Sequence, residues 1–311
     1  MKRGVVLSSG AAKGAYAIGI LDYLIKEKQY SWDVSVGTST GALIAPLIVL
    51  NRIDKLKDAY LNINSDNIFS INPFNNKGKI RLLNAVYRIL TKKSSFGVGH
   101  KLQKFIERTF THIDYMQSKY DLKKIYLYST NYTTGKKECI CQKDVDYETF
   151  CKFMYASSSV PIAFEGVKIT HRNLDGFYLD GGVMEPLGIQ RAVEAGCDVI
   201  DIIILDPKTD DEKWYGTTTY EIFERTLELM QKELMDDDIL IGKLYGTQKH
   251  VTLNFYYTPY KLTNNSLIFN KEEMNKWYQD GYIYAKEHGP AKVLNLIATA
   301  PTEEIFKYKK A

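Results

Sequence analysis

The chain has 311 residues, of which 45% are hydrophobic and 25% are charged, and 41 Lys and Arg residues against 37 Asp and Glu residues leave a net charge of +4. These values are enough for a real core in an ordinary globular protein, and so small a charge gives no reason to expect a nucleic-acid partner. Four cysteines in a chain of this length exclude a disulfide framework and indicate reduced thiols in a cytoplasmic protein.

The first residues superficially look like a signal peptide, because Met1–Arg3 is basic and apolar residues follow it. Ser8–Gly10 and Lys13 interrupt the apolar stretch, which argues against a signal peptide. The longest apolar run, residues 42–50, is too short to span a bilayer and contains Pro46. We therefore expect neither a signal peptide nor a transmembrane segment, so that any membrane contact is peripheral.

Two strand–loop–helix steps open the chain. The spacing predicts a buried strand over residues 3–8, a loop of small residues over 9–14 and an amphipathic helix over 15–27. A second strand begins at Val34, turns at residues 37–41 and leads into a second helix. This order is typical of a parallel α/β sheet, in which sites form at the carboxyl ends of the strands. Both small-residue turns are expected at that edge.

The turn Gly37-Thr38-Ser39-Thr40-Gly41 places a serine between a strand and a helix. Small Gly37 and Gly41 leave room for a sharp turn, and a serine at its apex is exposed at the end of the sheet with a helix N-terminus behind it. Taken alone, the pattern favours a simple turn whose Ser or Thr caps the helix. The remaining parts of a site have to come from elsewhere in the chain.

A turn-rich stretch at residues 62–78 predicts an exposed connection. The next segment, residues 77–93, has six basic residues, no acidic ones and apolar residues at helical spacing. This pattern would suit contact with anionic lipid head groups. The alternative, which the segment alone slightly favours, is a surface helix that packs its apolar face on the core. The apolar residues are Ile80, Leu83, Val86, Tyr87 and Leu90.

The rest of the chain continues the α/β pattern. The spacing predicts strands over residues 125–128, 138–141, 174–180, 199–205 and 251–257, the first two joined as a hairpin, and helices over 147–156, 189–196, 220–243 and 272–287. The acidic triplet at 236–238 is expected to break the third of these helices. No repeat or linker divides the chain, and we expect one domain over residues 1–311.

Ser39 needs a group that takes its proton, because a neutral hydroxyl is a weak nucleophile. The chain has five histidines, and only His250 and His288 are late in the chain. His250 directly precedes a predicted strand and His288 lies near a predicted helix end, whereas a catalytic histidine is expected in a loop at a strand end. Asp180 closes an apolar run and precedes Gly181 and Gly182, which places its carboxylate at a strand end. A partly desolvated carboxylate beside a serine can accept the proton directly. A simple Asp-Gly turn is the alternative.

The loop Gly10–Gly14 precedes a helix and can supply backbone N–H groups to a developing oxyanion, and the amide of Thr40 adds a further donor. The loop lacks the glycine spacing of a dinucleotide site, because Ser9 and Ala11 stand where two glycines would be. Cys139 and Cys141 have no accompanying His or Cys cluster. We expect neither a cofactor nor a metal ion.

Three segments resemble the signature blocks of the patatin-like phospholipase family: residues 7–16, residues 37–41 and Asp180-Gly181-Gly182. Residues 156–161 together with Phe164 are similar to the segment that usually precedes the Asp block in that family. The resemblance covers roughly residues 3–206, and we expect residues 207–311 to complete the same domain.

The resemblance implies a three-layer α/β/α fold with a mainly parallel sheet and a metal-independent Ser-Asp dyad that hydrolyses acyl esters of lipids. It implies that Ser39 is the nucleophile and Asp180 its base, with oxyanion donors in the 10–14 loop. Its oxyanion residues are Gly10, Ala11, Ala12 and Thr40, and its supporting residues are Lys13, Gly14, Gly37, Gly41, Gly181 and Gly182. Lys13 matches a basic family position that orients a phosphate or the loop itself.

The chain departs from the family in the first block, where Ser9 and Ala11 replace two of its three glycines. Alanine keeps its N–H, but a positive φ at position 11 would strain it and reduce activity. Three functions stay open: a phospholipase A-like or lysophospholipase-like hydrolase, an acyltransferase that uses the same acyl-enzyme, and a catalytically weak, membrane-associated binding module.

Overall fold

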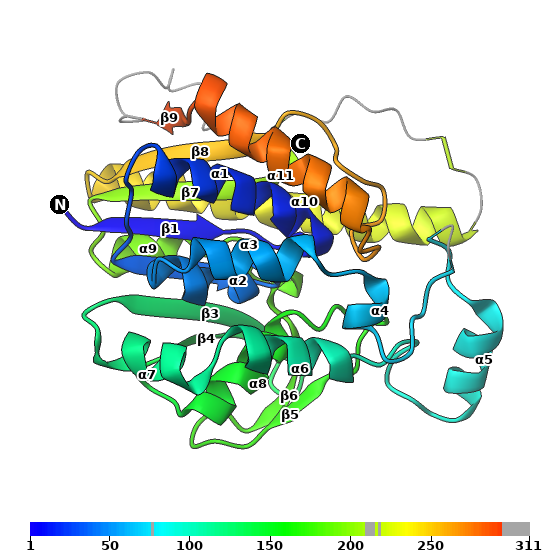
Figure 1. Ribbon diagram of the computed structural model, residues 1–311. Coiled ribbons are helices and arrows are strands. Elements are labelled where there is room, and N and C mark those ends of the chain that lie inside the picture. Colours follow the sequence, from blue (N-terminus) through cyan, green and yellow to red (C-terminus); the bar gives the residue numbers. More distant parts are fainter. Residues whose placement is uncertain (76–77, 209–214, 217–218, 294–311) are drawn as a thin grey trace, which may run out of the picture.

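A single nine-stranded sheet forms the centre of the protein (Figure 1), in a computed structural model that describes residues 1–75, 78–208, 215–216 and 219–293. Its central strands run parallel in the order β3-β2-β1-β7-β8, and antiparallel strands extend both edges. The parallel strands are β3 (Lys124–Asn131), β2 (Val34–Thr38), β1 (Arg3–Leu7), β7 (Val199–Pro207) and β8 (Thr252–Thr258). The antiparallel strands are β4 (Lys136–Cys141), β5 (Val167–Ile169), β6 (Gly176–Asp180) and β9 (Ala291–Val293).

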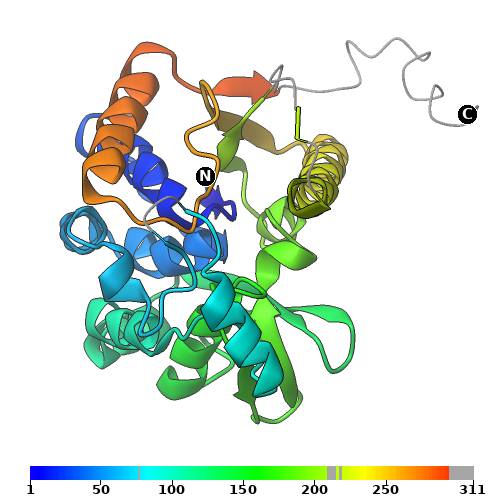
Figure 2. The same ribbon diagram turned by 90° about the vertical axis from the view of Figure 1, so that its right-hand side faces the viewer.

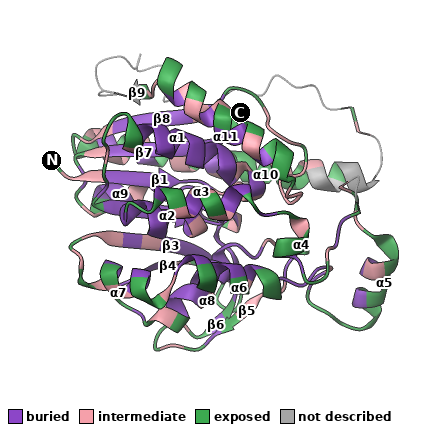
Figure 3. Ribbon diagram, in the orientation of Figure 1, coloured by how far each residue is buried: buried purple, intermediate pink, exposed green. Residues whose placement is uncertain are grey.

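Helices cover both faces of the sheet, because the central strands are apolar on both sides and bury both (Figure 3). The face with the larger hydrophobic core carries α1 (Gly14–Lys26), α2 (Thr40–Val49), α3 (Ile53–Leu61), α8 (Tyr147–Ser157) and α11 (Lys271–Glu287). The opposite face carries α9 (Ile189–Glu194) and α10 (Thr219–Gln248). The expected three-layer α/β/α fold with a mainly parallel sheet is confirmed. The extent of the domain, 1–311, stays a prediction, since residues 294–311 lie outside the described residues.

Two expectations on local structure are wrong. The acidic triplet at 236–238 does not break its helix, because α10 continues through it and the Asp238 carboxylate accepts a hydrogen bond from the Leu187 N–H at 3.2 Å. The connection at 62–78 is only partly exposed. It contains the short helix α4 (Ser65–Ile68), and Ile68, Phe69 and Phe74 are buried in the core.

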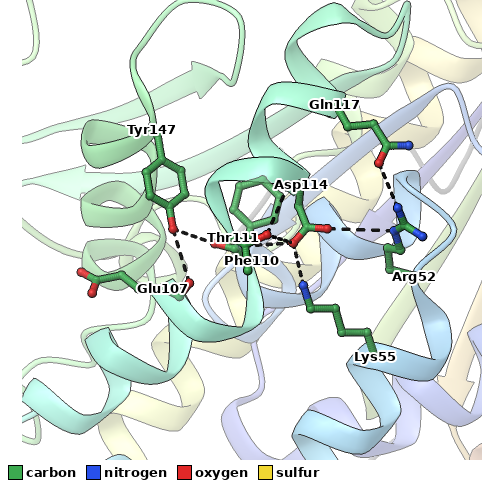
Figure 4. Close-up of polar contacts among 8 residues, drawn as sticks. All are labelled: Arg52, Lys55, Glu107, Phe110, Thr111, Asp114, Gln117 and Tyr147. Atoms are coloured by element: carbon green, nitrogen blue, oxygen red, sulfur yellow. Dashed lines mark hydrogen bonds and ion pairs between the residues drawn. The ribbon is translucent and has the colours of Figure 1, made fainter.

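The spacing did not predict two helices, α6 (His100–Thr109) and α7 (His112–Tyr120). Polar contacts tie α6 to α8 and α7 to α3 (Figure 4). The Asp114 carboxylate accepts a hydrogen bond from Lys55 Nζ at 2.6 Å and another from the Thr111 hydroxyl at 2.6 Å. Burial alone would raise the pKa of Asp114, but these hydrogen bonds hold it below its ordinary value. At the C-terminal end of α6, which lines the cavity described below, the Tyr147 hydroxyl of α8 donates to the backbone oxygen of Phe110 at 3.0 Å.

The helix α5 (Leu82–Leu90) turns its polar residues inward and its apolar residues outward. The buried Arg88 guanidinium donates to the backbone oxygen of Ser95, and Asn84 Nδ2 donates to the backbone oxygen of Phe96 at 2.7 Å. Leu83 is 89% exposed and Leu90 is 76% exposed. The expectation that the apolar face of this segment packs on the core is therefore wrong. Lys77, the first residue of the basic segment, lies outside the described residues.

The carboxyl ends of the parallel strands all point to one edge of the sheet. The helix α5 and the N-terminal part of α10 both lie at this edge, as the view turned toward it shows (Figure 2). Within the described part of the chain, no helix combines the length and the apolar character needed to cross a membrane.

Candidate active site

Ser39 lies at the junction of β2 and α2 in a strained backbone conformation, with φ 56° and ψ −121°. Both flanking glycines are required by close backbone contacts. A Cβ on Gly37 would lie 2.2 Å from the carbonyl oxygen of Gly41, and a Cβ on Gly41 would lie 2.2 Å from that of Leu7. A positive φ at a residue other than glycine persists only where the surroundings enforce it. The small residues of the 37–41 turn therefore allow this conformation.

A run of three serines at the C-terminal end of α8, Ser157 to Ser159, holds the turn in place. The Ser39 N–H donates to Ser157 Oγ at 2.9 Å, and Ser158 Oγ donates to the Ser39 carbonyl oxygen at 3.0 Å. The carbonyl oxygen of Ser159 accepts the N–H of Asp180 at 3.0 Å. The same three residues thus position both Ser39 and Asp180. In the sequence, this segment was recognised by its resemblance to the family, and no role was predicted for its serines.

Ser39 and Asp180, 141 residues apart, form a buried hydrogen bond of 2.7 Å between Ser39 Oγ and Asp180 Oδ2. The other carboxylate oxygen accepts the Gly182 N–H at 2.7 Å, which fixes the orientation of the carboxylate. Burial raises the pKa of Asp180 to about 7, and the hydrogen bonds from Ser39 and Gly182 oppose the rise. A carboxylate with this pKa can hold or release a proton near neutral pH.

The loop before α1 lies next to the Ser39 turn, since its Ala11 lines the same cavity as Ser39. The amides of Gly10, Ala11 and Thr40 have no hydrogen-bond acceptor among the residues that the structure describes. The amide of Ala12 is occupied, because it donates to the carbonyl oxygen of Ser266 at 3.0 Å. We therefore leave Ala12 out of the set of candidate oxyanion donors.

Ala11, which stands where the family has a glycine, has a positive φ of 46°. An alanine in the left-handed region costs about 1 kcal/mol relative to glycine. The strained residue borders the same cavity as Ser39.

The cavity beside Ser39 is lined mostly by apolar side chains. They come from α2, α6, the residues around α4, the loop after α8 and the segment that precedes α11: Leu43, Ile63, Ile68, Leu102, Phe105, Phe164, Leu267 and Phe269. The Tyr60 hydroxyl at its wall is paired with Thr40 Oγ1 at 2.6 Å. No histidine of the described chain lines it. Such a lining suits a hydrocarbon chain.

The model of a family described as patatin-like phospholipase matches residues 5–193. Among solved structures, the crystal structure of VipD from Legionella pneumophila is similar at 13% sequence identity and a TM-score of 0.46, and the alignment covers 94% of this chain and 68% of that one. A search of curated proteins found no match.

Proposed function

Because the chain belongs to the patatin-like phospholipase family, and so to a family of lipid acyl hydrolases, we propose that it cleaves acyl esters of lipids through a Ser39–Asp180 dyad. The observation that carries the proposal is the buried 2.7 Å hydrogen bond between Ser39 Oγ and Asp180 Oδ2. The apolar cavity beside Ser39 supports a lipid substrate, since it offers an acyl chain a dry, hydrocarbon-like lining.

In the first step, Ser39 Oγ attacks the carbonyl carbon of the ester while its proton passes to Asp180 Oδ2. The negative charge that develops on the carbonyl oxygen is stabilised by the amides of Gly10, Ala11 and Thr40. When the carbon–oxygen bond of the ester breaks, Asp180 returns the proton to the leaving alkoxide. The products of this step are the alcohol and an acyl group on Ser39.

In the second step, water attacks the acyl carbon and loses a proton to Asp180. The tetrahedral intermediate collapses, the fatty acid leaves, and the proton returns to Ser39 Oγ. An alcohol that took the place of water would give acyl transfer instead, so the products formed with and without added glycerol distinguish the two reactions.

The proposal is tested by labelling with a fluorophosphonate, which modifies only activated serines. We expect one adduct per chain, located by mass spectrometry on the peptide that contains Ser39, and no adduct on the Ser39→Ala variant. A wild-type protein that stays unlabelled while its fold is intact would support the binding module instead. An adduct on any other serine would contradict the assignment of Ser39.

We also propose that α5 contacts the membrane that carries the substrate. Its apolar residues face outward at the carboxyl edge of the sheet, where Ser39 lies, and exposed basic residues flank it on both sides. The exposed basic residues are Lys79, Arg81, Lys92 and Lys93. Arg88 belongs to the interior contacts of α5 and is left out of this set. An outward apolar face with basic flanks is the arrangement of a helix that lies in an anionic lipid surface.

Leu83→Ser/Leu90→Ser should weaken binding to phosphatidylglycerol vesicles at least about tenfold, since each leucine loses the free energy of inserting its side chain into lipid. The measurement is sedimentation with vesicles in a Ser39→Ala background, which removes turnover. The matched control is Ile113→Ser/Leu122→Ser, because these residues are 78% and 93% exposed and belong to α7 and to the entry of β3. Equal binding of the two double variants would contradict the proposal.

A further inference from the structure

A second cavity borders the loop before α1 and the turn that follows Asp180. Its wall contains Ser9 and Lys13 of the loop that also supplies Ala11 to the apolar cavity, and Gly182, whose N–H binds Asp180. The remaining wall comes from the end of β7, from α10 and from residues 261–266. Both cavities therefore border the same loop, and the second reaches Gly182, which is hydrogen-bonded to Asp180. The mechanism above uses only the apolar cavity.

The lining of this second cavity is strongly basic. It contains six basic side chains and three acidic ones. The basic residues are Lys13, Lys208, Arg225, Lys232, Lys243 and Lys261, and the acidic residues are Asp206, Glu228 and Asp236. Neutral side chains that can donate hydrogen bonds, among them Ser9, Thr263 and Asn264, complete the wall.

The carboxylates leave two of these cations unneutralised. Lys13 Nζ lies 2.5 Å from Asp206 Oδ1, and Lys232 Nζ lies 3.7 Å from Asp236 Oδ2. Glu228 is shared between Arg225 at 3.0 Å and Lys261 at 3.9 Å. In the described part of the chain, neither Lys208 nor Lys243 forms an ion pair.

Lys243 is half-buried and lies close enough to Lys208 for the two charges to repel. Burial is the main cause that lowers the pKa of Lys243, and the charge of Lys208 lowers it further. The ammonium group of Lys243 also faces the ring of Phe255, at 5.5 Å from its centroid. The charge of Asp236 opposes the lowering of this pKa, but Asp236 forms its ion pair with Lys232. An anion bound between the two lysines would relieve both the repulsion and the loss of solvation.

We propose that this cavity binds the phosphate of a ligand with net negative charge, and that in the lipid substrate this phosphate belongs to the head group. In a phosphoglyceride the phosphate is attached to the glycerol that carries the esters, a few bonds from the scissile carbonyl. The acyl chain then occupies the apolar cavity, the ester lies at Ser39, and the phosphate lies among Lys13, Lys208 and Lys243. The assignment to the substrate rests on the proposed hydrolase function, whereas the anion site itself does not.

The test has two arms, each run on the whole chain. In the first arm, binding of glycerol 3-phosphate to Ser39→Ala is measured by calorimetry, and Lys208→Gln/Lys243→Gln in that background should weaken it at least about tenfold. In the second arm, kcat/KM for dihexanoyl phosphatidylglycerol is divided by that for dihexanoyl phosphatidylcholine, both below their micelle concentrations. The same double substitution in the Ser39 protein should lower this ratio at least about tenfold.

Lys104→Gln/Lys276→Gln is the matched control, because both lysines are exposed and lie outside the cavity. The exposed Lys208→Gln alone serves where the double variant fails to fold. A fall in both arms assigns the site to the lipid head group. A fall in glycerol 3-phosphate binding alone assigns it to a soluble phosphate ester and refutes the head-group assignment.

Equal binding of glycerol 3-phosphate by the lysine variant and its parent overturns the anion site, and so does the absence of binding to the parent. If no ester is hydrolysed by the Ser39 protein, the proposed hydrolase function fails, while the first arm still decides the anion site.

Discussion

Ser39→Ala and Asp180→Asn should each lower the rate of fatty-acid release from lipid esters by at least about a thousandfold. Alanine removes the attacking oxygen. Asparagine keeps the shape of Asp180 and its contact with Gly182 but cannot accept the proton of Ser39. Since the two residues act as a unit, the double variant should be no slower than either single variant.

The measurement is kcat/KM for a short-chain ester and for a panel of phospholipids, with each variant assayed in parallel with the wild type. Ser35→Ala is the matched control, because Ser35 is a buried serine of the same strand whose hydroxyl has no partner in the described structure. Retained turnover in both dyad variants would remove the dyad from the mechanism. Loss of turnover in Ser35→Ala would indicate a general effect of changes in β2.

Asp180→Asn should also change how stability depends on pH. The pKa of Asp180 is raised from 3.8 to about 7 in the folded protein, so the folded state binds a proton more tightly than the unfolded state does. Its contribution to the free energy of unfolding therefore falls as pH rises from about 4 to about 7, and is lowest above pH 7. Over that pH range, the free-energy cost of ionising the buried Asp180 carboxylate grows to roughly 4 kcal/mol.

Asparagine cannot ionise, so the variant should gain stability relative to the wild type as pH rises from 5 to 8. The measurement is urea unfolding of both proteins at several pH values. The pKa of Asp238 is also raised to about 7, but its contribution cancels because both proteins contain it. The wild-type kcat/KM should rise through the same range, with an apparent pKa near 7, since only ionised Asp180 accepts a proton.

Asp114→Asn provides a control with the opposite sign. The pKa of Asp114 is held below its ordinary value, so this carboxylate contributes stability above that ordinary value and loses it as pH falls through the lowered pKa. The Asp114 variant should be less stable than the wild type at neutral pH, with a difference that shrinks in acid. A pH-independent difference between Asp180→Asn and the wild type would contradict the raised pKa of Asp180.

The order of the elements and the position of the turn at Ser39 could be predicted because they depend on local chemistry. Alternating strand and helix patterns allow few arrangements other than a parallel sheet, and the carboxyl ends of its strands meet at one edge. That rule was enough to bring Ser39 and the 10–14 loop to the same edge. Asp180 comes instead from β6, which runs antiparallel to β3 and places Asp180 opposite Ser129. The glycines of the turn were readable as well, because close backbone contacts leave no room for a side chain.

Contacts between segments that are distant in the chain could not be predicted from the sequence. From the sequence, the amide of Ala12 is as suitable an oxyanion donor as the amides of its neighbours. In the structure it donates a hydrogen bond to the carbonyl oxygen of Ser266, 254 positions later in the chain. The basic cavity is similar, since Lys13, Lys208 and Lys243 are scattered along the chain and form one wall only after α10 packs beside the end of β7. Neither feature leaves a signal in any single segment.

The sequence alone determined the α/β class, the turn at Ser39 and the apolar stripe of α5, because strand and helix periods and tight turns are set by neighbouring residues. Only the tertiary structure decided that the stripe faces outward, that Ser39 and Asp180 share a hydrogen bond, and that Ala11 has a positive φ. A periodic pattern fixes which side chains share a face of a helix, but not what that face meets. The partner is chosen by the packing of the whole chain, here by Arg88 and Asn84, which hold the opposite face of α5 to residues 95–97.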